Sequence, residues 1–240
     1  MLAESGRHTS GAGRRLIIAI DGPAASGKTT TAKLVARRLG YMHVDTGAMY
    51  RAITLKVLRS GLAPDDRQGI SRLLDSTRVQ MRNEGGTLHV LLDGRDVTEE
   101  IRTPEVTRAV SAVSSLGDVR HAMVREQRAL GEKGGIVLEG RDIGTVVFPN
   151  AECKFFLIAG IGARAERRLK ELQAGGVKAD LKELEKEIAE RDRFDSTREL
   201  SPLRKAADAV EIDTSDLTIE EQVEIVLGKV RERQEQLRGV

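Results

Sequence analysis

The chain has 240 residues, enough for one domain or for a domain with an embedded smaller one. Its 39 basic and 37 acidic residues nearly balance, and it has no Trp, two Tyr and four Phe, so we expect no nucleic-acid partner. No apolar window predicts a membrane span or a signal peptide, so no membrane partner is expected. The single Cys153 favours a cytoplasmic protein.

The chain is expected to open with a strand, a turn and a helix. Residues 16–20 are continuously apolar, as in a strand buried on both faces of a parallel sheet. From Thr29 onward apolar residues recur at helical spacing, and Gly40 is a typical residue just after a helix C-terminus. The segment between them is rich in glycine.

Further apolar runs lie over 41–44, 135–138, 154–159 and 209–212, separated by stretches with helical periodicity. Such alternation is typical of an α/β fold. Together with the first strand, these runs predict a five-stranded parallel sheet flanked by helices. Residues 218–221 form a capping box that predicts the start of the last helix.

One region interrupts this alternation. Residues 77–82 and 87–92 alternate between apolar and polar side chains, and the segment 83–86 between them predicts a hairpin turn. We expect a small antiparallel β unit with one solvated face, inserted at about residues 60–105. The Gly-Arg-Asp sequence at 94–96 belongs to this unit, so we assign it to a turn and to no functional role.

A nucleotide-binding motif connects the first strand to the first helix. It reads Gly22-Pro23-Ala24-Ala25-Ser26-Gly27-Lys28-Thr29 and matches the pattern G-x-x-x-x-G-K-[ST] in its required context. Its glycines let backbone N–H groups surround a polyphosphate, Lys28 reaches the terminal phosphates, and Thr29 offers its hydroxyl to Mg²⁺. We therefore expect a nucleoside triphosphate site. The Asn-Lys-x-Asp motif that reads guanine is absent, which argues against a GTPase switch.

Two polar motifs follow other core strands. Residues 45–51 come after the strand expected over 41–44, and residues 139–145 come after the strand over 135–138. Because the carboxyl ends of parallel strands meet at one edge of a sheet, both motifs are expected beside the triphosphate site. Taken alone, the first motif is equally consistent with an ordinary helix start capped by Thr46.

A third candidate segment is a charged helix. Leu184, Ile188, Arg191, Asp195 and Arg198 are spaced by 4, 3, 4 and 3 residues, so they share one helix face. A face that is apolar at its start and then carries Arg, Asp and Arg predicts a ligand or partner for its charged end. The alternative is a solvated charged helix.

Taken as a set, these segments resemble the bacterial cytidylate kinases. The resemblance rests on the P-loop, Asp45-Thr46-Gly47-Ala48-Met49-Tyr50-Arg51, Gly140-Arg141-Asp142-Ile143-Gly144-Thr145, and Arg191-x-x-x-Asp195-x-x-Arg198. It runs from about Leu16 to the C-terminus. The chain departs from the family pattern at Glu139, where Asp is more common, and at Ala25-Ser26, where a glycine is frequent.

The resemblance implies a role for each segment. The implied catalytic residues are Lys28, Arg141 and Arg191. The implied ATP-binding residues are Gly22, Pro23, Ala24, Ala25, Ser26, Gly27, Lys28, Thr29, Thr30 and Arg167. The implied substrate-binding residues are Thr46, Arg51, Ser111, Arg120, Arg141, Asp142, Arg191, Asp195 and Arg198. The implied Mg²⁺ ligands are Thr29 and Glu139.

Within the substrate set, the resemblance divides the work between phosphate, sugar and base. It assigns the acceptor phosphate to Arg51, Arg141 and Arg198, and the ribose and transferring group to Arg191 and Asp195. The base falls to Ser111, Arg120 and Asp142. Hydrogen-bond chemistry agrees, because the 4-amino group of cytosine is a donor suited to Asp142, whereas its N3 and O2 accept from Arg120. Uracil would place a carbonyl against the carboxylate.

The resemblance also implies a fold in three parts. A P-loop core comprises residues 16–45, 135–160 and 192–240, and a nucleoside monophosphate-binding domain of residues 46–134 carries the β insertion. Residues 161–191 form a short helical lid, whose closure over two nucleotides would exclude water. Residues 1–15 are expected to be a flexible leader, and the protein is expected to be a monomer.

The activity implied is transfer of the γ-phosphoryl group of ATP to CMP or dCMP, with Mg²⁺, giving ADP and CDP or dCDP. The attacking phosphate oxygen is already an anion near neutral pH, so we assign no histidine as a general base. Two alternatives belong to other classes: a P-loop kinase for another small acceptor, and a non-catalytic nucleotide-binding module. The cytosine-reading residues argue against the first, and the arginines beside the triphosphate site argue against the second.

Overall fold

The structure of the protein, a computed structural model, describes residues 15–84 and 87–239. The expected leader, apart from Arg15, and the glycine pair in the expected hairpin turn lie outside the described residues. None of the described helices is both long enough and apolar enough to cross a membrane.

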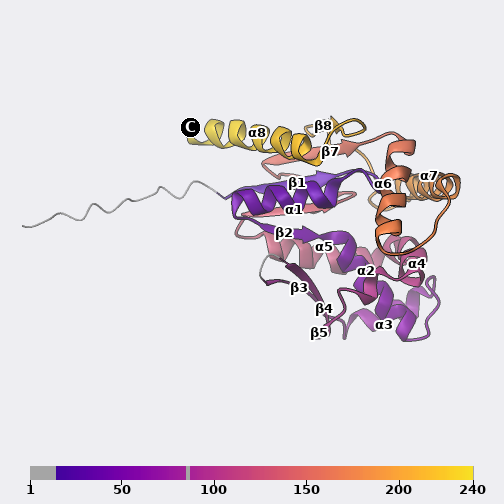
Figure 1. Cartoon of the computed structure of the whole chain (residues 1–240). Coiled ribbons are helices and arrows are strands. Elements are labelled where there is room, and N and C mark those ends of the chain that lie inside the picture. Colours follow the sequence, from indigo (N-terminus) through magenta and orange to yellow (C-terminus); the bar gives the residue numbers. More distant parts are fainter. Residues whose placement is uncertain (1–14, 85–86, 240) are drawn as a thin grey trace, which may run out of the picture.

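The centre of the fold is one parallel sheet (Figure 1). Its strands are β1 (Ile17–Asp21), β2 (Met42–Asp45), β6 (Ile136–Gly140), β7 (Cys153–Ile158) and β8 (Val210–Asp213). They lie in the order β2-β6-β1-β7-β8, which confirms the predicted α/β class and its five parallel strands. The central strands are mostly apolar and buried because helices cover both of their faces.

Two helices cover one face of this sheet. They are α1 (Lys28–Leu39) and α8 (Ile219–Arg238), which lie next to each other in Figure 1. Their buried residues, such as Val35 and Val226, form one apolar cluster with Ile18 and Phe155 of the sheet. The predicted stops and starts are present: Gly40 ends α1 with a left-handed φ of 64°, and the Thr218 and Glu221 side chains form the capping box of α8.

A second unit packs against the other face of the sheet. It comprises residues 46–131 and is here called the insertion unit. Its helices are α2 (Thr46–Arg59), α3 (Arg67–Leu74), α4 (Pro104–Ser115) and α5 (Gly117–Gly131), with a 3-10 turn at Glu100–Arg102. A single apolar cluster joins residues of α2 and α5, such as Ile53 and Met123, to Val44 and Leu138 of the sheet. The insertion unit is therefore packed onto the core through α2 and α5.

The predicted antiparallel element lies inside the insertion unit. It consists of β3 (Val79–Glu84), β4 (Thr87–Leu92) and β5 (Arg95–Asp96), in the order β3-β4-β5. The sequence assigned residues 94–96 to a turn only. That assignment was wrong, because Arg95 and Asp96 pair with β4 as a short strand. Both residues of β5 are exposed, as expected outside a site.

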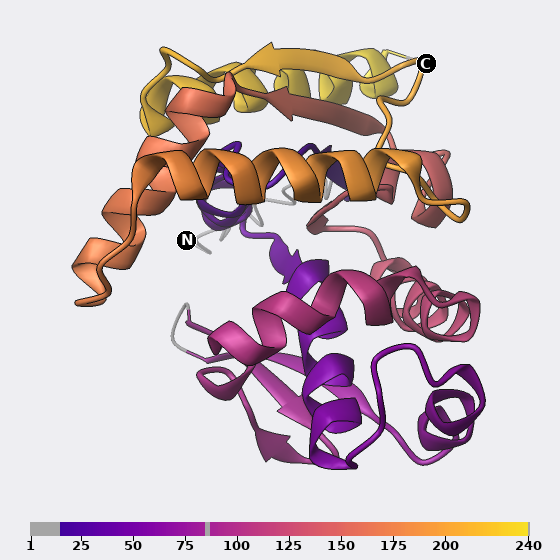
Figure 2. The ribbon, with the colours of Figure 1, turned by 90° about the vertical axis from the view of Figure 1, so that its right-hand side faces the viewer.

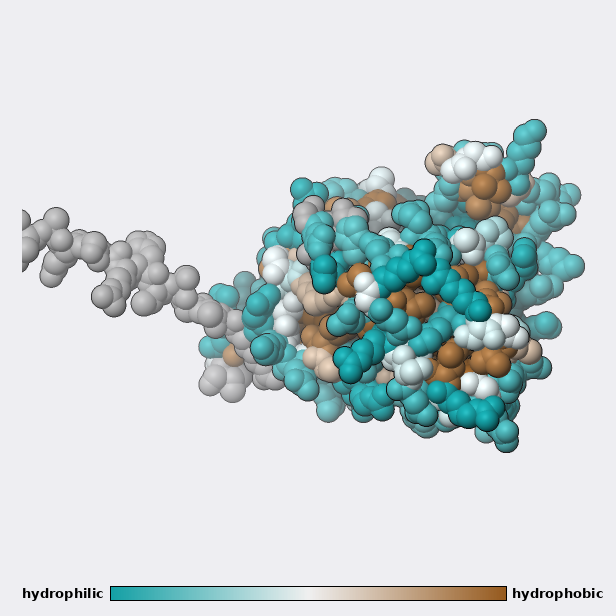
Figure 3. Space-filling view, turned by 90° about the horizontal axis from the view of Figure 1, so that it is seen from below, coloured by the Kyte–Doolittle hydropathy of each residue, from teal (hydrophilic) through white to brown (hydrophobic). Residues whose placement is uncertain are grey.

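The surface of the molecule seen from below in Figure 3 has small hydrophobic areas separated by hydrophilic side chains.

Two further helices complete the part of the chain that the structure describes. Helix α6 (Ile161–Ala174) packs on α7 (Leu181–Thr197) through a separate apolar cluster of Ala165, Leu184 and Ile188. Figure 2 shows α7, in orange, running between the sheet and the insertion unit. This helix is continuous through residue 191, where the sequence places the end of the lid. A five-residue π-helical turn, Ile143–Val147, follows β6.

Candidate active site

The P-loop joins β1 to α1 at the carboxyl edge of the sheet. It needs glycine at Gly22, where φ is 151° and an added Cβ would overlap the carbonyl oxygen of Leu157 in β7. The Lys28 ammonium turns back into the loop, where it donates to the Pro23 carbonyl and to Ser26 Oγ at 3.3 Å. Burial lowers the pKa of Lys28 to about 7, and the nearby Arg141 acts in the same direction. The loop is thus shaped for an anion before a nucleotide arrives.

Strand register explains why the predicted motifs meet. Asp21 of β1 lies beside Gly140 of β6, and Asp45 of β2 lies beside Glu139. The residues that follow these strand ends therefore emerge at one edge of the sheet. Asp45, and not Thr46, caps α2, since its carboxylate accepts from Ala48 N at 3.0 Å. Thr46 is free to donate its hydroxyl to the Glu139 carbonyl at 2.7 Å.

A cavity of about 970 Å³ opens at this edge, between the P-loop, the insertion unit and α7. Of the residues predicted for ATP, substrate and metal, Gly22 and Pro23 do not line the cavity. Those that line it are Ala24, Ala25, Ser26, Gly27, Lys28, Thr29, Thr30, Thr46, Arg51, Ser111, Arg120, Glu139, Arg141, Asp142, Arg167, Arg191, Asp195 and Arg198. The structure thus brings together residues from both halves of the chain.

One part of the cavity concentrates positive charge. Burial lowers the pKa of Arg191 to about 10, and the guanidinium groups of Arg141 and Arg51 add to this effect. Burial also lowers the pKa of Arg51, opposed by Asp45 and reinforced by Arg102 and Arg141. These buried like charges repel one another, and a bound anion would offset that repulsion. A phosphate group, which accepts several charge-assisted hydrogen bonds from arginine, fits this place.

Another part contains a buried ion pair. Arg120 of α5 and Asp142, which follows β6, form a charge-assisted hydrogen bond, and both side chains are almost fully buried. Arg120 also donates to the Ser114 carbonyl at 3.3 Å, and its guanidinium lies 5.5 Å from the centre of the Tyr50 ring. Ser111 lies one helical turn before Ser114 on α4. These groups provide donors and acceptors suited to a flat, polar base.

A third set of contacts connects these regions to α7. Arg141 donates from Nε to Asp195 Oδ2 at 2.8 Å, and Arg198 lies 4.0 Å from Asp195 and 3.9 Å from Asp142. The Arg198 backbone ends α7, and its Nε donates to the Ser201 carbonyl at 2.7 Å. The predicted Arg-Asp-Arg face of the helix therefore turns into the cavity and is no solvated surface.

Several buried polar atoms in this region have no hydrogen-bond partner among the residues that the structure describes. They include Tyr50 Oη, Arg120 Nε, Arg191 Nε and Arg198 Nη2. An unpartnered buried polar group costs free energy unless water or a ligand satisfies it. Their concentration around one cavity is what a polar, anionic ligand would require.

The two predicted Mg²⁺ ligands lie side by side at the P-loop. Thr29 donates from Oγ1 to Glu139 Oε2 at 2.7 Å, and the other Glu139 oxygen is 3.1 Å from His43 Nε2. Within residues 15–84 and 87–239, no cluster of three or more His, Cys, Asp or Glu side chains forms an all-protein metal cage. Mg²⁺ typically takes one or two protein oxygens together with waters and nucleotide phosphates, so this pair fits such an ion.

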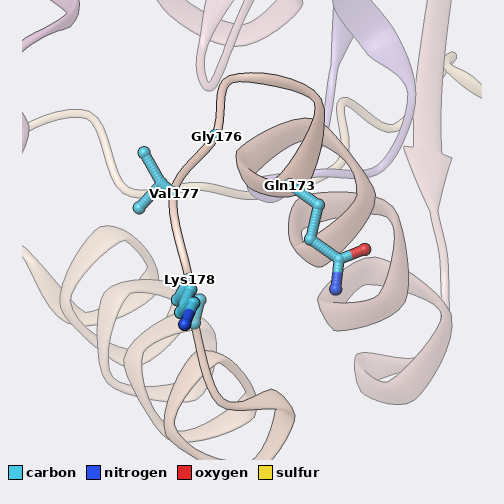
Figure 4. Close-up of a pocket in the computed structure, with 5 residues that line it drawn as sticks. Gln173, Gly176, Val177 and Lys178 are labelled. Atoms are coloured by element: carbon cyan, nitrogen blue, oxygen red, sulfur yellow. The ribbon is translucent and has the colours of Figure 1, made fainter.

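Helix α6 contacts the P-loop side of the cavity. Arg164 donates to Asp192 Oδ2 at 2.5 Å and to the Ala24 carbonyl of the P-loop at 3.3 Å. Arg167 is hydrogen-bonded to Thr214 Oγ1 at 3.1 Å and to nearby carbonyls, although it lines the cavity. A separate hollow of about 400 Å³ lies where α6 turns into α7. Figure 4 shows its Gln173 and Val177 side chains pointing away from each other, so they converge on no ligand.

The cavity also contains residues that sequence reasoning did not single out. They include Arg102, Arg108, Phe194 and Gln222, and Tyr50, which was quoted in a motif without a role. Arg108 lies one helical turn before Ser111, so helical spacing from that residue could have found it. Arg102 belongs to a short 3-10 turn with no pattern of its own. His43, read only as a strand residue, also contacts Glu139.

Comparison with known proteins agrees with this geometry. Residues 18–232 match the family model described as "Cytidylate kinase". A cytidylate kinase of Halalkalibacterium halodurans is 50% identical over 92% of this chain and 99% of its own length. One from Geobacillus kaustophilus is 53% identical over 92% of this chain and 98% of its own length. Since the family model covers nearly all of the chain, this protein belongs to the cytidylate kinase family.

Proposed function

We propose that the protein transfers the γ-phosphoryl group of ATP to CMP or dCMP, giving ADP and CDP or dCDP. The observation that carries this proposal is a single cavity lined both by the P-loop and by the buried Arg120 and Asp142 pair. A triphosphate site and a base-reading site that share one cavity allow two nucleotides to meet directly. The relatives named cytidylate kinases support CMP as the acceptor.

The chemistry requires positioning and charge neutralisation more than proton transfer. The acceptor phosphate is an anion near neutral pH and attacks the γ-phosphorus in line, so no base removes a proton. Arg51, Arg141 and Arg198 would hold that phosphate, and Lys28 would hold the donor phosphates. Arg191 and Asp195, which face the same cavity from α7, would hold the ribose and the transferring group. Once closure of the lid shields the cavity from water, these charges would act with little screening.

Base selection would use the ion pair between Arg120 and Asp142. A cytosine 4-amino group donates to the Asp142 carboxylate, while N3 and O2 accept from Arg120, and Ser111 lies nearby on the cavity wall. Uracil presents a carbonyl oxygen to the same carboxylate. This arrangement would disfavour UMP, because both facing groups are acceptors.

Mg²⁺ belongs to this proposal, with Thr29 and Glu139 as its protein ligands. The metal would neutralise charge on the donor phosphates as it develops. The Glu139 side chain is one methylene longer than the Asp that is more common at this place. Its carboxylate nonetheless reaches Thr29 Oγ1 at 2.7 Å, so the extra length still brings it to the P-loop.

We also propose three parts: a core of residues 16–45, 135–160 and 192–240, a mobile acceptor-binding domain of residues 46–134, and a lid of residues 161–191. The separate apolar cluster of α6 and α7 supports a lid that moves as a unit. Closure would bring Arg167 and Arg168 over the donor phosphates and exclude water. Because α7 continues past residue 191, we expect the hinge at this end to lie beyond Thr197.

The remaining parts of the proposal concern the setting of the enzyme. A monomer suffices, since one chain supplies residues to every part of the cavity. A cytoplasmic location is favoured by the single cysteine, which cannot form an intrachain disulfide. The near-balanced charge of the chain favours small nucleotides over nucleic acid as partners.

The test is ADP release from ATP and Mg²⁺ with CMP, dCMP, UMP or AMP offered separately at equal concentrations, with a control lacking acceptor. We expect fast turnover with CMP and dCMP. Equal turnover with UMP would overturn the base-reading assignment and leave a kinase for another acceptor. No acceptor-dependent release would favour the nucleotide-binding module.

A further inference from the structure

Asp21 is a buried carboxylate that the proposed mechanism does not use. It is the last residue of β1 and directly precedes Gly22 of the P-loop. Asp21 is only 4% exposed and is not among the residues that line the cavity. A carboxylate buried beside a nucleotide site, yet not contacting the site, calls for a physical reason.

The hydrogen bonds of Asp21 lead to the acceptor side. Its Oδ1 accepts from the backbone N–H of Ile143 and its Oδ2 from that of Gly144, both at 2.8 Å. These two N–H groups begin the π-helical turn that directly follows Arg141 and Asp142. One side chain therefore ties the residue before the P-loop to the loop that carries two acceptor-site residues.

Packing leaves this contact little freedom. A Cβ added at Gly144 would lie 3.4 Å from Asp21 Oδ2 and 3.2 Å from Cδ of Lys154. One at Gly140 would lie 2.7 Å from Cδ1 of Ile143. The turn is thus held close to β1 by small residues and by two charge-assisted hydrogen bonds, which fix it more tightly than apolar contacts would.

The charge of Asp21 is maintained at a cost. Burial raises its pKa to about 6; the N–H groups of Gly144 and Ile143 and the Lys28 ammonium oppose this rise, and Asp142 adds to it. At neutral pH the group is therefore ionised although its environment disfavours ionisation. A group near an active site that lowers the stability of the fold is frequently retained because function requires it.

We propose that Asp21 is a positioning residue that couples the P-loop to the loop bearing Arg141 and Asp142, and so holds the two nucleotides in register for transfer. The inference rests on the proposed CMP kinase activity. Asp21 acts through the Ile143 and Gly144 backbone and touches neither nucleotide. An error of about 1 Å in the relative placement of reacting groups costs roughly a hundredfold in rate, so a coupling of this kind matters for kcat.

The test is the substitution Asp21→Asn, which keeps the shape but turns an NH₂ group toward one of the two N–H donors. We expect kcat with CMP to fall about tenfold and the KM for CMP to rise, while the Kd for ATP alone changes less than about twofold. The matched control is Asp66→Asn. The Asp66 carboxylate also accepts a hydrogen bond from a backbone N–H, that of Gly69, but it lies at the start of α3 and does not line the cavity. That variant should keep its activity within about twofold.

A pH series separates positioning from a purely structural role. Below about pH 6 the wild-type Asp21 becomes neutral and resembles the variant. The wild-type to variant ratio of kcat should therefore fall toward one as the pH decreases. Lys28, Asp142 and Lys154 face this joint, and the charge of Asp21 raises the pKa of Lys28. The Kd for ATP is therefore measured at each pH, so that the altered titration of Lys28 in the variant is accounted for. A ratio independent of pH, or equal losses for ATP and CMP, would overturn the proposal.

A second variant covers the case in which Asp21→Asn does not fold. Gly144→Ala crowds the same joint from the other side and should give the same pattern, a fall in kcat with ATP affinity preserved. Unchanged kinetics in this variant would contradict the coupling. Wild-type turnover with CMP is measured first: its absence overturns the proposed function and this inference with it, whereas normal wild-type turnover and unaffected variants overturn the inference alone.

Discussion

Charged side chains in the cavity are held by ion pairs, and Asp142 is the one on which the proposed base selection most depends. Its carboxylate pairs with Arg120 and lies 3.9 Å from Arg198, so its chemical character is fixed by two guanidinium groups. An ionised carboxylate accepts hydrogen bonds and donates none, whereas an amide also donates. A cavity that offers an acceptor at this place can distinguish an amino group from a carbonyl.

The substitution Asp142→Asn replaces one carboxylate oxygen with a donor of the same size. We expect the ratio of kcat/KM for CMP over UMP to fall about a hundredfold, since uracil O4 gains a donor and the cytosine amino group loses an acceptor. Initial-rate kinetics with both acceptors measure this ratio. Asp208→Asn, at an exposed partner of Lys154, is the control, and an unchanged ratio in the Asp142 variant would contradict the assignment.

Asp195 offers a test through stability. Burial opposes its ionisation, but the guanidinium groups of Arg141 and Arg191 outweigh burial and hold its pKa below the usual value. A depressed pKa contributes stability that is present above about pH 4 and is lost as the pH falls through the native value. Asp195→Asn should therefore lower the free energy of unfolding by about 2 kcal/mol at pH 7, and by progressively less as the pH falls below about 4. Urea titrations across this pH range check this, and a pH-independent difference would refute it.

At the scale of elements, sequence patterns predicted the features that depend on neighbouring residues in the chain. The P-loop, the capping box at Thr218 and the stop at Gly40 were identified from the sequence because each depends on neighbouring residues. The strand start near residue 77 was placed two residues early, since Val79 is the first to pair across the hairpin. Boundaries of this kind depend on the partner strand, which a local pattern does not contain.

The cavity wall shows the same limit. Arg102 and Arg108 lie between recognised motifs and reach the cavity only because α4 packs across α2. The contact of His43 with Glu139 likewise depends on the pairing of β2 with β6. Motif residues could be predicted because ligand chemistry limits which residue types occupy them. Residues placed by tertiary packing alone have no such local signal.

The P-loop itself gives a prediction at this scale. Gly22→Ala would place a Cβ against the Leu157 carbonyl at a left-handed φ, whereas Gly40→Ala meets the same kind of φ with nothing within 4 Å. We expect a loss of roughly 3 kcal/mol in unfolding free energy and of ATP binding for Gly22→Ala. Strain alone should make Gly40→Ala cost about 1 kcal/mol with ATP affinity intact. Denaturant unfolding and ATP titration compare the two, and equal losses would argue against the backbone overlap.

At the scale of the whole molecule, the fold gathers like charges at one place. The chain carries a net charge of only +2, yet Arg141 lies close enough in the cavity to lower the pKa of both Arg51 and Arg191. The parallel sheet, the insertion unit and α7 each contribute to this cluster. Repulsion within it disfavours the empty native state, and a bound anion removes that repulsion.

Sulfate should therefore stabilise the protein specifically. A ligand that binds only the native state adds RT ln(1 + [L]/Kd), about 1.4 kcal/mol at ten times Kd, which raises Tm by roughly 4 °C in a chain of this size. Thermal unfolding in sulfate and in chloride at equal ionic strength separates binding from screening. Arg191→Ala should reduce the gain from sulfate, because it removes one member of the cluster, whereas Arg95→Ala on the exposed strand β5 should leave it unchanged. Equal gains in both salts would mean that the arginines respond to ionic strength alone and do not form an anion site.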